Sequence, residues 1–394
     1  MSRLWLAATL SLAVFVPSAL AAIDDEEPAV AGRKLSDWVK MLKTDKDEAH
    51  RRAALTALQI IGKRLETSKA VPPIVEAARN DESEAVRKAA TQTLGEVALA
   101  AHDASDPRKG TSKKMAEVAK ETLKQAVEGL IEELKVDVSA EVRQTAAVAL
   151  GRLGVDARTA VEALTNALKD KSDSVRAASA EALGRIGPEA KSAATPLMEA
   201  LRDKKADRFL RVYAAFALGR IKPDTPDAAA EALAEALGDA EAPAEVRKAC
   251  ADALGQLGTA GEAAVPALAA ALKEKQNLEV RRACANALGQ LGPAAAKALP
   301  ELRQALKDDD KYVRIHSLHA LGGIGKDAAD ALPEIIRCVK EDSVTEVRVA
   351  AIETVGSIGV KAPDAIDALT TSSRSPQTAV REAAVEALKK LQGE

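Results

Sequence analysis

Residues 175–187 read Val-Arg-Ala-Ala-Ser-Ala-Glu-Ala-Leu-Gly-Arg-Ile-Gly, and variants of this phrase recur along the chain. Most copies begin with an apolar residue and Arg and continue through small residues to Leu-Gly. Successive copies mostly lie 33 to 36 residues apart, a spacing typical of stacked helical repeats. The ten Arg residues, the first and last in degenerate copies, are Arg51, Arg87, Arg143, Arg176, Arg211, Arg247, Arg281, Arg314, Arg348 and Arg381.

Each phrase predicts an amphipathic helix. Counted from the Arg, positions −1, +3, +6, +7 and +10 share one side of a helix and hold apolar or small residues, so we expect this face to be buried. Positions +1, +5 and +9 point the other way and vary. A Gly at +11 suits the left-handed residue that ends a helix. An apolar segment such as residues 265–273 precedes each phrase, which makes each unit a helix, a turn and a second helix.

This pattern resembles the HEAT repeat, and in particular the short HEAT-like repeats of phycobilin lyases. The resemblance rests on the Val-Arg-x-x-Ala-x-x-Ala-Leu-Gly phrases and on a Pro in the preceding helix, at Pro196, Pro266, Pro300 and Pro333. It implies an all-α fold, a right-handed α-α superhelix of the HEAT or armadillo type. We therefore expect residues 34–394 to form about ten helical pairs, with the second helix of each pair on the concave side.

One spacing, of 56 residues between Arg87 and Arg143, indicates an insertion near residues 99–120. Residues 101–112 are polar and predict a loop, and residues 113–135 predict a long helix. Loops that interrupt a regular scaffold often carry function, but they also tolerate changes of length. The sequence leaves the role of this loop open.

The first residues have the pattern of a secretion signal. Arg3 precedes the apolar residues 4–16, and Ala19 and Ala21 match the small residues of a cleavage site. We expect residues 1–21 to be a signal peptide and residues 22–33 an acidic linker, which places the chain in the periplasm or outside the cell. The alternative is an uncleaved N-terminal membrane anchor, and a cleaved chain would have no stable membrane insertion.

Composition disfavours several functions. The 56 Lys and Arg are balanced by 59 Asp and Glu, so no basic field is available for nucleic acid. Aromatic residues make up only 2% of the chain, too few for typical cofactor pockets, and we expect no cofactor. Deoxyhypusine hydroxylase has a similar architecture and binds iron through His-Glu pairs, but no His of this chain is followed by Glu. We expect a non-catalytic scaffold for an unknown protein partner; the alternative is a HEAT-like enzyme related to that hydroxylase or to the lyases.

Two sets of residues are candidates for partner binding. The first is an apolar patch on the outward columns of neighbouring units; the alternative is that its rings fill a local packing gap. The second is a His pair at i and i+3 on one helix, a spacing that can hold a metal but lacks a third ligand, so we expect no metal. The candidates are Val148, Ala177, Val212, Tyr213 and Phe216 in the patch, and His316 and His319 in the pair.

Cysteine and aspartate also occupy repeated positions. Cys250 and Cys284 both lie at +3, where a small residue faces a neighbouring helix, so we expect buried free thiols; Cys338 has no evident partner. An Asp lies six residues before the Arg in six units and is expected to cap a helix while Arg contacts it or its neighbour. The other four units have Lys205, Glu241, Lys275 and Ser375 at this position, so we expect other contacts to hold the turns of these units.

Overall fold

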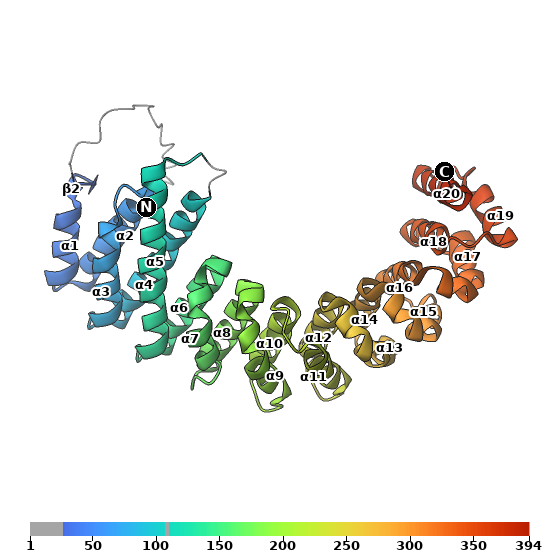
Figure 1. The fold of residues 1–394 in the computed structure, drawn as a ribbon, viewed down its shortest axis with the longest axis horizontal. Helices are drawn as coiled ribbons and strands as arrows, with labels where there is room; N and C mark the ends of the chain where they lie inside the picture. Colours follow the sequence, from blue (N-terminus) through green and yellow to red (C-terminus); the bar gives the residue numbers. More distant parts are fainter. Residues whose placement is uncertain (1–26, 107–109, 394) are drawn as a thin grey trace, which may run out of the picture.

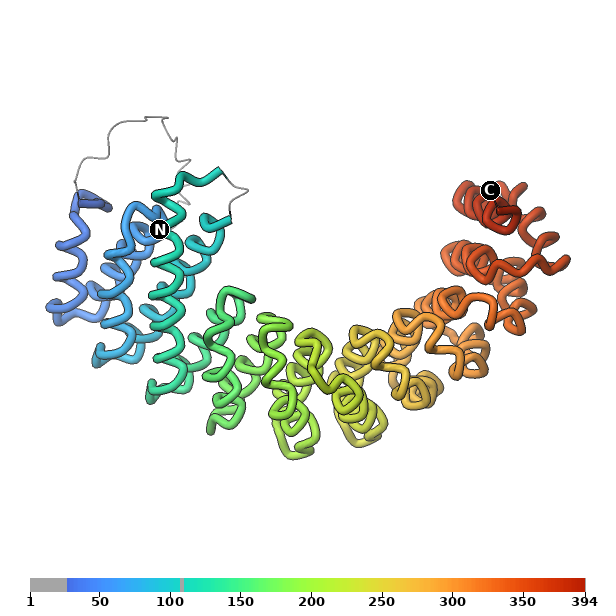
Figure 2. Tube along the Cα trace, in the orientation of Figure 1, coloured from blue at the N-terminus to red at the C-terminus, as the bar shows by residue number. Residues whose placement is uncertain are grey.

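The computed structural model describes residues 27–106 and 110–393, and the chain forms an open arc of stacked helices (Figures 1 and 2). The predicted signal peptide lies outside the described residues. Within these residues, twenty α-helices form ten pairs. The first helices are α1 (Leu35–Thr44), α3 (Val71–Asn80), α5 (Lys113–Val136), α7 (Val161–Ala167), α9 (Ala194–Arg202), α11 (Pro226–Gly238), α13 (Val265–Leu272), α15 (Leu299–Ala305), α17 (Leu332–Glu341) and α19 (Pro363–Ser372). The second helices are α2 (Glu48–Arg64), α4 (Glu84–Ser105), α6 (Ala140–Leu153), α8 (Asp173–Ile186), α10 (Arg208–Arg220), α12 (Ala244–Gln256), α14 (Leu278–Leu291), α16 (Lys311–Ile324), α18 (Thr345–Ile358) and α20 (Thr378–Gln392).

Short 3₁₀ helices and one hairpin complete the secondary structure of these residues. The 3₁₀ helices are η1 (Ser68–Ala70), η3 (Gly154–Ala160), η4 (Gly187–Ala193), η5 (Gly258–Ala264), η6 (Gly292–Ala298) and η7 (Gly325–Ala331). Strands β1 (Ala29–Val30) and β2 (Arg33–Lys34) pair antiparallel. No helix of the described residues has both the length and the apolar character needed to cross a membrane.

The helices stack in chain order, each second helix against the second helices of the adjacent units. The second helices line the concave side of the arc and the first helices lie outside it (Figure 1). This arrangement confirms the predicted all-α solenoid, in which every unit buries its apolar stripe against its neighbours.

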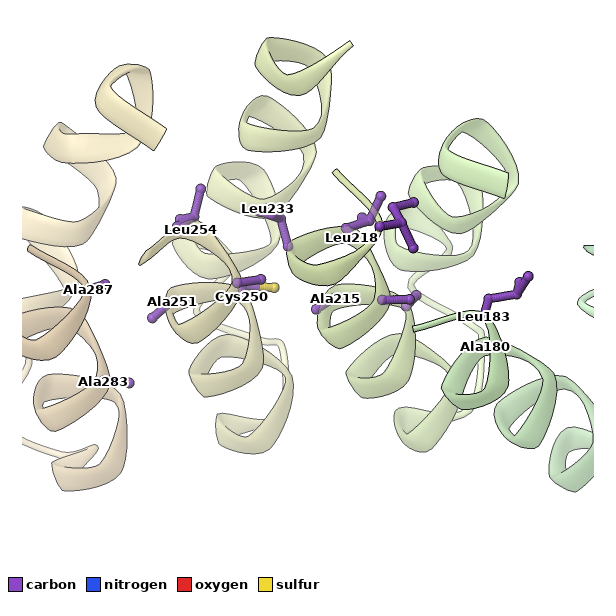
Figure 3. Packing of buried hydrophobic residues seen from close by; sticks show 14 of the residues in the cluster. Ala180, Leu183, Ala215, Leu218, Leu233, Cys250, Ala251, Leu254, Ala283 and Ala287 are labelled. Carbon is purple, nitrogen blue, oxygen red and sulfur yellow. The ribbon is translucent and has the colours of Figure 1, made fainter. Parts of the chain in front are cut away.

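The predicted apolar face forms the core. Leu183, Leu218 and Leu254 all occupy +7 and are completely buried, and the small residues around them let neighbouring helices approach closely (Figure 3). The Gly at +8 is part of this contact. A Cβ built on Gly151 of α6 would lie 2.9 Å from the Cα of Ala182 on α8, too close for a larger residue.

The Gly at +11 has positive φ in every unit where it was predicted, at Gly154, Gly187, Gly258, Gly292, Gly325 and Gly359. The predicted left-handed helix end is correct for Gly359, with φ 69° and ψ 19°. It is wrong in detail for others such as Gly187, where ψ is −140°. That region is open to glycine and turns the chain directly into a 3₁₀ helix.

The insertion lengthens helices more than it adds a loop. Residues 101–105 belong to α4, contrary to the predicted loop over residues 101–112, and α5 begins at Lys113. Ala101 and Ala119 are buried against each other's helices in a small satellite core, which explains why α4 continues. The two long helices project as a ridge at the N-terminal end of the arc (Figure 1).

The described part of the predicted linker, residues 27–33, is folded against the first unit. Glu27 accepts hydrogen bonds from the Ser36 backbone N–H, at 2.5 Å, and from its hydroxyl, at 2.9 Å. The Trp38 indole N–H donates to the Val30 carbonyl at 3.1 Å. The hairpin therefore packs against the first helical pair of the described residues.

The repeated Arg and Asp connect neighbouring units. Arg143 donates through Nε and Nη2 to both carboxylate oxygens of Asp170 in the next unit, at 2.7 and 2.8 Å, and through Nη1 to the carbonyl of its own unit's Asp137. Both partners are largely buried, and hydrogen bonds from Arg143 lower the pKa of Asp170 despite burial, which raises it. We call each such link a rung; the others are Arg51–Asp81, Arg87–Asp137, Arg281–Asp308 and Arg314–Asp342.

The rungs are interrupted in the middle of the arc. Arg176 reaches Asp173 of its own helix, and Arg211 is buried but makes no ion pair with a described residue. Its Nε donates to the Leu201 carbonyl at 3.0 Å. In each rung the Asp lies two residues before the cap of the following helix, as Asp170 does before Ser172. Asp203, in the unit after Arg176, lies four residues before the cap of α10, and Asp239, in the unit after Arg211, lies four residues before the cap of α12, so neither Arg finds its Asp in place. Arg247 restores a link through Glu274, at 2.5 Å.

All three cysteines are free and buried, as predicted for Cys250 and Cys284. Burial raises the pKa of Cys250 to about 12 and also raises the pKa of Cys284. Cys250 lies among Leu and Ala side chains of the stacked helices (Figure 3). These thiols are core residues and are poor nucleophiles at neutral pH.

Candidate functional site

The concave side carries three hollows that share lining residues and so form one groove. The first lies over α2, α4 and α6 and has a volume of about 860 Å³. The second, of about 350 Å³, lies over α6, α8 and α10, and the third, of about 590 Å³, over α8, α10, α12 and α14. Val148 lines the first and second, and Tyr213 lines the second and third. The groove therefore runs across the inner helices from α2 to α14.

The structure brings the predicted apolar patch together in this groove. Val148, Ala177 and Tyr213 line the second hollow, and Val212, Tyr213 and Phe216 line the third. Burial raises the pKa of Tyr213, and the Glu181 carboxylate adds to this effect.

Ala177 differs from the prediction, because it is only 7% exposed. The column at +1 was expected to face solvent freely, yet most of its residues are at least half-buried. The reason is the curvature of the arc, which brings neighbouring inner helices close together. Ala177 thus contributes the floor of the second hollow rather than an exposed contact.

Phe216 packs against a neighbouring helix and also lines the groove. A Cβ built on Gly184 of α8 would lie 2.7 Å from the Phe216 ring, so this ring packs directly on the glycine backbone. Arg220 lies over the ring, 5.5 Å from its centre, and donates to the Gly184 carbonyl at 3.1 Å. The remaining surface of the half-buried ring lines the third hollow. Packing and groove formation are therefore not alternatives here.

The charges of the third hollow are mostly neutralised in pairs. Arg185 contacts Glu181 at 2.6 Å, and Lys248 contacts Asp252 at 2.6 Å. Glu245 at the rim is exposed and makes no ion pair with a described residue. The hollow thus offers aromatic and aliphatic surface with little net charge.

Three amide side chains line the same hollow without hydrogen-bond partners among the described residues. They are Gln256 of α12 and Asn286 and Gln290 of α14. Gln256 and Gln290 occupy +9 in neighbouring units, and each reaches back over the +8 glycine of the unit before. A Cβ on Gly255, for example, would lie 2.5 Å from Gln290 Oε1.

The predicted His pair lies outside this groove. His316 and His319 are on α16, and their ring centres are 6.5 Å apart with nearly perpendicular planes. Burial lowers the pKa of His316, and repulsion from His319 lowers it further. In the part of the chain that the structure describes, no group of three His, Cys, Asp or Glu residues could hold a metal ion.

Sequence reasoning missed two features. Phe209 was not among the predicted site residues, although it follows an i, i+4, i+7 spacing with Tyr213 and Phe216; it is half-exposed and lines the second hollow. Glu133 of α5 is completely buried, and neither carboxylate oxygen has a hydrogen-bond partner among the described residues. Burial, with the nearby Asp137 carboxylate, raises the pKa of Glu133 to about 7. No sequence signal distinguishes this Glu from the exposed ones around it.

The family model for HEAT repeats matches residues 35–108, 127–212, 204–289, 265–356 and 299–389. The chain is a HEAT-repeat protein. These matches cover both arms of the arc and the inner helices that line the groove.

HEAT-repeat solenoids among the solved structures share this fold at low identity. Yeast importin-beta (Kap95p) has a TM-score of 0.56 at 14% identity, over 91% of this chain and 51% of that one. Importin beta in an ammonium sulfate condition has a TM-score of 0.55 at 15% identity, over 90% and 50%. Kap121p bound to Nup53p has a TM-score of 0.50 at 13% identity, over 91% and 45%. The chain therefore spans about half the length of these proteins, and no curated protein matches its sequence.

Proposed function

We propose that the chain is a non-catalytic scaffold that binds a protein partner through the groove on its concave side. The observation that carries the proposal is the third hollow, where Val212, Tyr213 and Phe216 form an aromatic and aliphatic surface on an inner face. Such clusters in concave sites are the usual anchors of protein interfaces. The similar solenoid Kap121p has been solved bound to Nup53p, which supports a binding role for this architecture.

The test is affinity capture with a pair of matched variants. Val212→Glu places a charge in the third hollow at +1, a column that holds Lys88, Lys248 and Glu382 in other units and so accepts charge. Val349→Glu makes the same change at +1 of α18, away from the three hollows. We expect the wild-type chain and Val349→Glu to retain the same partner and Val212→Glu to lose it, with unchanged helicity. Retention by all three would reject the groove as the binding site.

We propose further that the scaffold works outside the cytoplasm. The support is the sequence of residues 1–21, with its charged start, apolar middle and Ala19-x-Ala21 end. Cell fractionation followed by N-terminal sequencing tests this: we expect an exported chain beginning at Ala22. A cytoplasmic chain that retains Met1 would contradict export, and a membrane-bound chain that retains it would favour the anchor.

A further inference from the structure

We propose that the occupant of the third hollow is an extended, uncharged polypeptide segment with an aromatic or large aliphatic side chain at its centre. This inference rests on the proposed function and specifies the chemistry of the partner. It is carried by the contrast, in one hollow, between charges that are paired and amides that have no hydrogen-bond partner among the described residues.

The paired charges disfavour a charged ligand. Arg185 and Lys248 already contact Glu181 and Asp252, so an acidic ligand would have to displace these carboxylates, and a basic ligand would have to displace the cations. Glu245 is too exposed to hold a basic group strongly. Apolar surface from Val212, Tyr213 and Phe216 remains for an uncharged side chain.

The amides favour a peptide backbone. Gln256, Asn286 and Gln290 each have both donor and acceptor groups, and a peptide unit presents the same two groups in return. A helix satisfies its own backbone groups internally, whereas an extended chain leaves them available. The amides therefore select an extended segment over a helical one.

The spacing of the repeats fits this assignment. Gln256 and Gln290 occupy the same position on adjacent inner helices, and adjacent helices pack about 8–10 Å apart. Three residues of an extended polyproline II chain complete one turn, span about 9 Å and leave the backbone groups free. A segment in this conformation along the groove would therefore present equivalent backbone groups to the two Gln side chains at every third residue, with its central side chain toward Phe216.

The first test uses labelled nonapeptides of Ser, Thr and Gly with Trp, Leu or Ala at the centre, measured by fluorescence anisotropy with the purified chain. We expect Trp- or Leu-centred peptides to bind at least about tenfold more tightly than Ala-centred ones, because the larger side chain buries more apolar surface. Equal or tighter binding by acidic, basic or helix-stapled peptides would overturn the proposal, as would failure of all the uncharged peptides to bind.

The second test perturbs the amides. N-methylation of two backbone amides three residues apart, and separately the double variant Gln256→Leu and Gln290→Leu, should each weaken binding about tenfold. Measuring the N-methylated peptide against the double variant should show little further weakening of binding, because both changes remove the same hydrogen bonds. Gln304→Leu on the outer helix α15 is the control and should leave binding unchanged. If Val212→Glu abolishes capture of the natural partner but the Gln variants do not, this inference fails while the proposed function stands.

Discussion

The two arms of the arc and its middle are joined in different ways. In the arms, a buried Arg of one unit binds an Asp of the next, as in Arg143–Asp170 and Arg281–Asp308. In the middle, Arg176 and Arg211 make no such link to a described residue, and the Phe216 ring packs on Gly184 between two inner helices. The difference teaches that displacing the Asp within a turn removes the link between an Arg and the next unit, and that an aromatic ring at another repeat position can then supply the contact between inner helices.

The largest expected effect is loss of a rung. Arg143→Ala leaves the carboxylate of Asp170 buried without its partner and should reduce the free energy of unfolding by about 3 kcal/mol. Arg176→Ala removes a partly exposed pair with Asp173 and a hydrogen bond to the Asp170 carbonyl, leaves no buried carboxylate unpaired, and should cost about 1 kcal/mol. Urea unfolding, with hydrogen exchange to localise the change, measures both. Equal losses would show that the rungs do not distinguish the arms from the middle.

A second prediction concerns a weak point in the N-terminal arm. Because burial raises the pKa of Glu133 from 4.5 to about 7, its ionisation destabilises the fold progressively as pH rises between these values and no further above them. Glu133→Gln removes this titration and should stabilise the chain at pH 8 by up to about 3 kcal/mol relative to pH 4. Chemical unfolding across this pH range measures the effect.

The outcome that would contradict the second prediction is a difference between wild type and Glu133→Gln that does not change with pH. Glu128→Gln on the same helix is the control, since Glu128 is exposed and lines a hollow on the outer side.

Two glycine substitutions compare the middle with the C-terminal arm. Gly184→Ala should destabilise by about 2 kcal/mol, because the new Cβ would meet the Phe216 ring at 2.7 Å and the Ala217 backbone at 2.9 Å. Gly289→Ala should instead stabilise by about 0.5–1 kcal/mol, because its nearest contact would be 3.7 Å and Ala favours a helix. Thermal unfolding measures both. If both substitutions change stability in the same direction, the Phe216 ring does not make the contact between α8 and α10 tighter than the contact between α14 and α16.

The smallest stability effect is expected at the rim of the groove. Phe209 is 50% exposed, so Phe209→Ala should change the free energy of unfolding by less than about 0.5 kcal/mol. It should still weaken capture of the partner, because Phe209 lines the second hollow. If Phe209→Ala lowers stability but leaves capture of the partner unchanged, Phe209 is a core residue and not part of the binding groove.

Much of the fold could be predicted because the same sequence pattern recurs in successive units. The phrase at residues 175–187 predicts a helix with one apolar face, and recurrence at a fixed spacing leaves stacking as the way to bury that face. Its columns also located the buried thiols of Cys250 and Cys284 and placed Val212 and Tyr213 on the inner side. The insertion was harder, because residues 101–105 are polar on one side and join the helix only through a satellite core.

The sequence by itself determined the repeat unit, its two helices and the face that each buries, because helix formation and amphipathic patterning depend on residues a few positions apart. Only the tertiary structure decided which Arg reaches an Asp, which Glu is buried without a partner, and which side chains meet in one groove. These outcomes depend on turn length and on curvature accumulated over several units. Asp203 lies two residues too early in its turn to form a rung with Arg176. The sequence around Asp203 does not by itself show where the neighbouring helix lies.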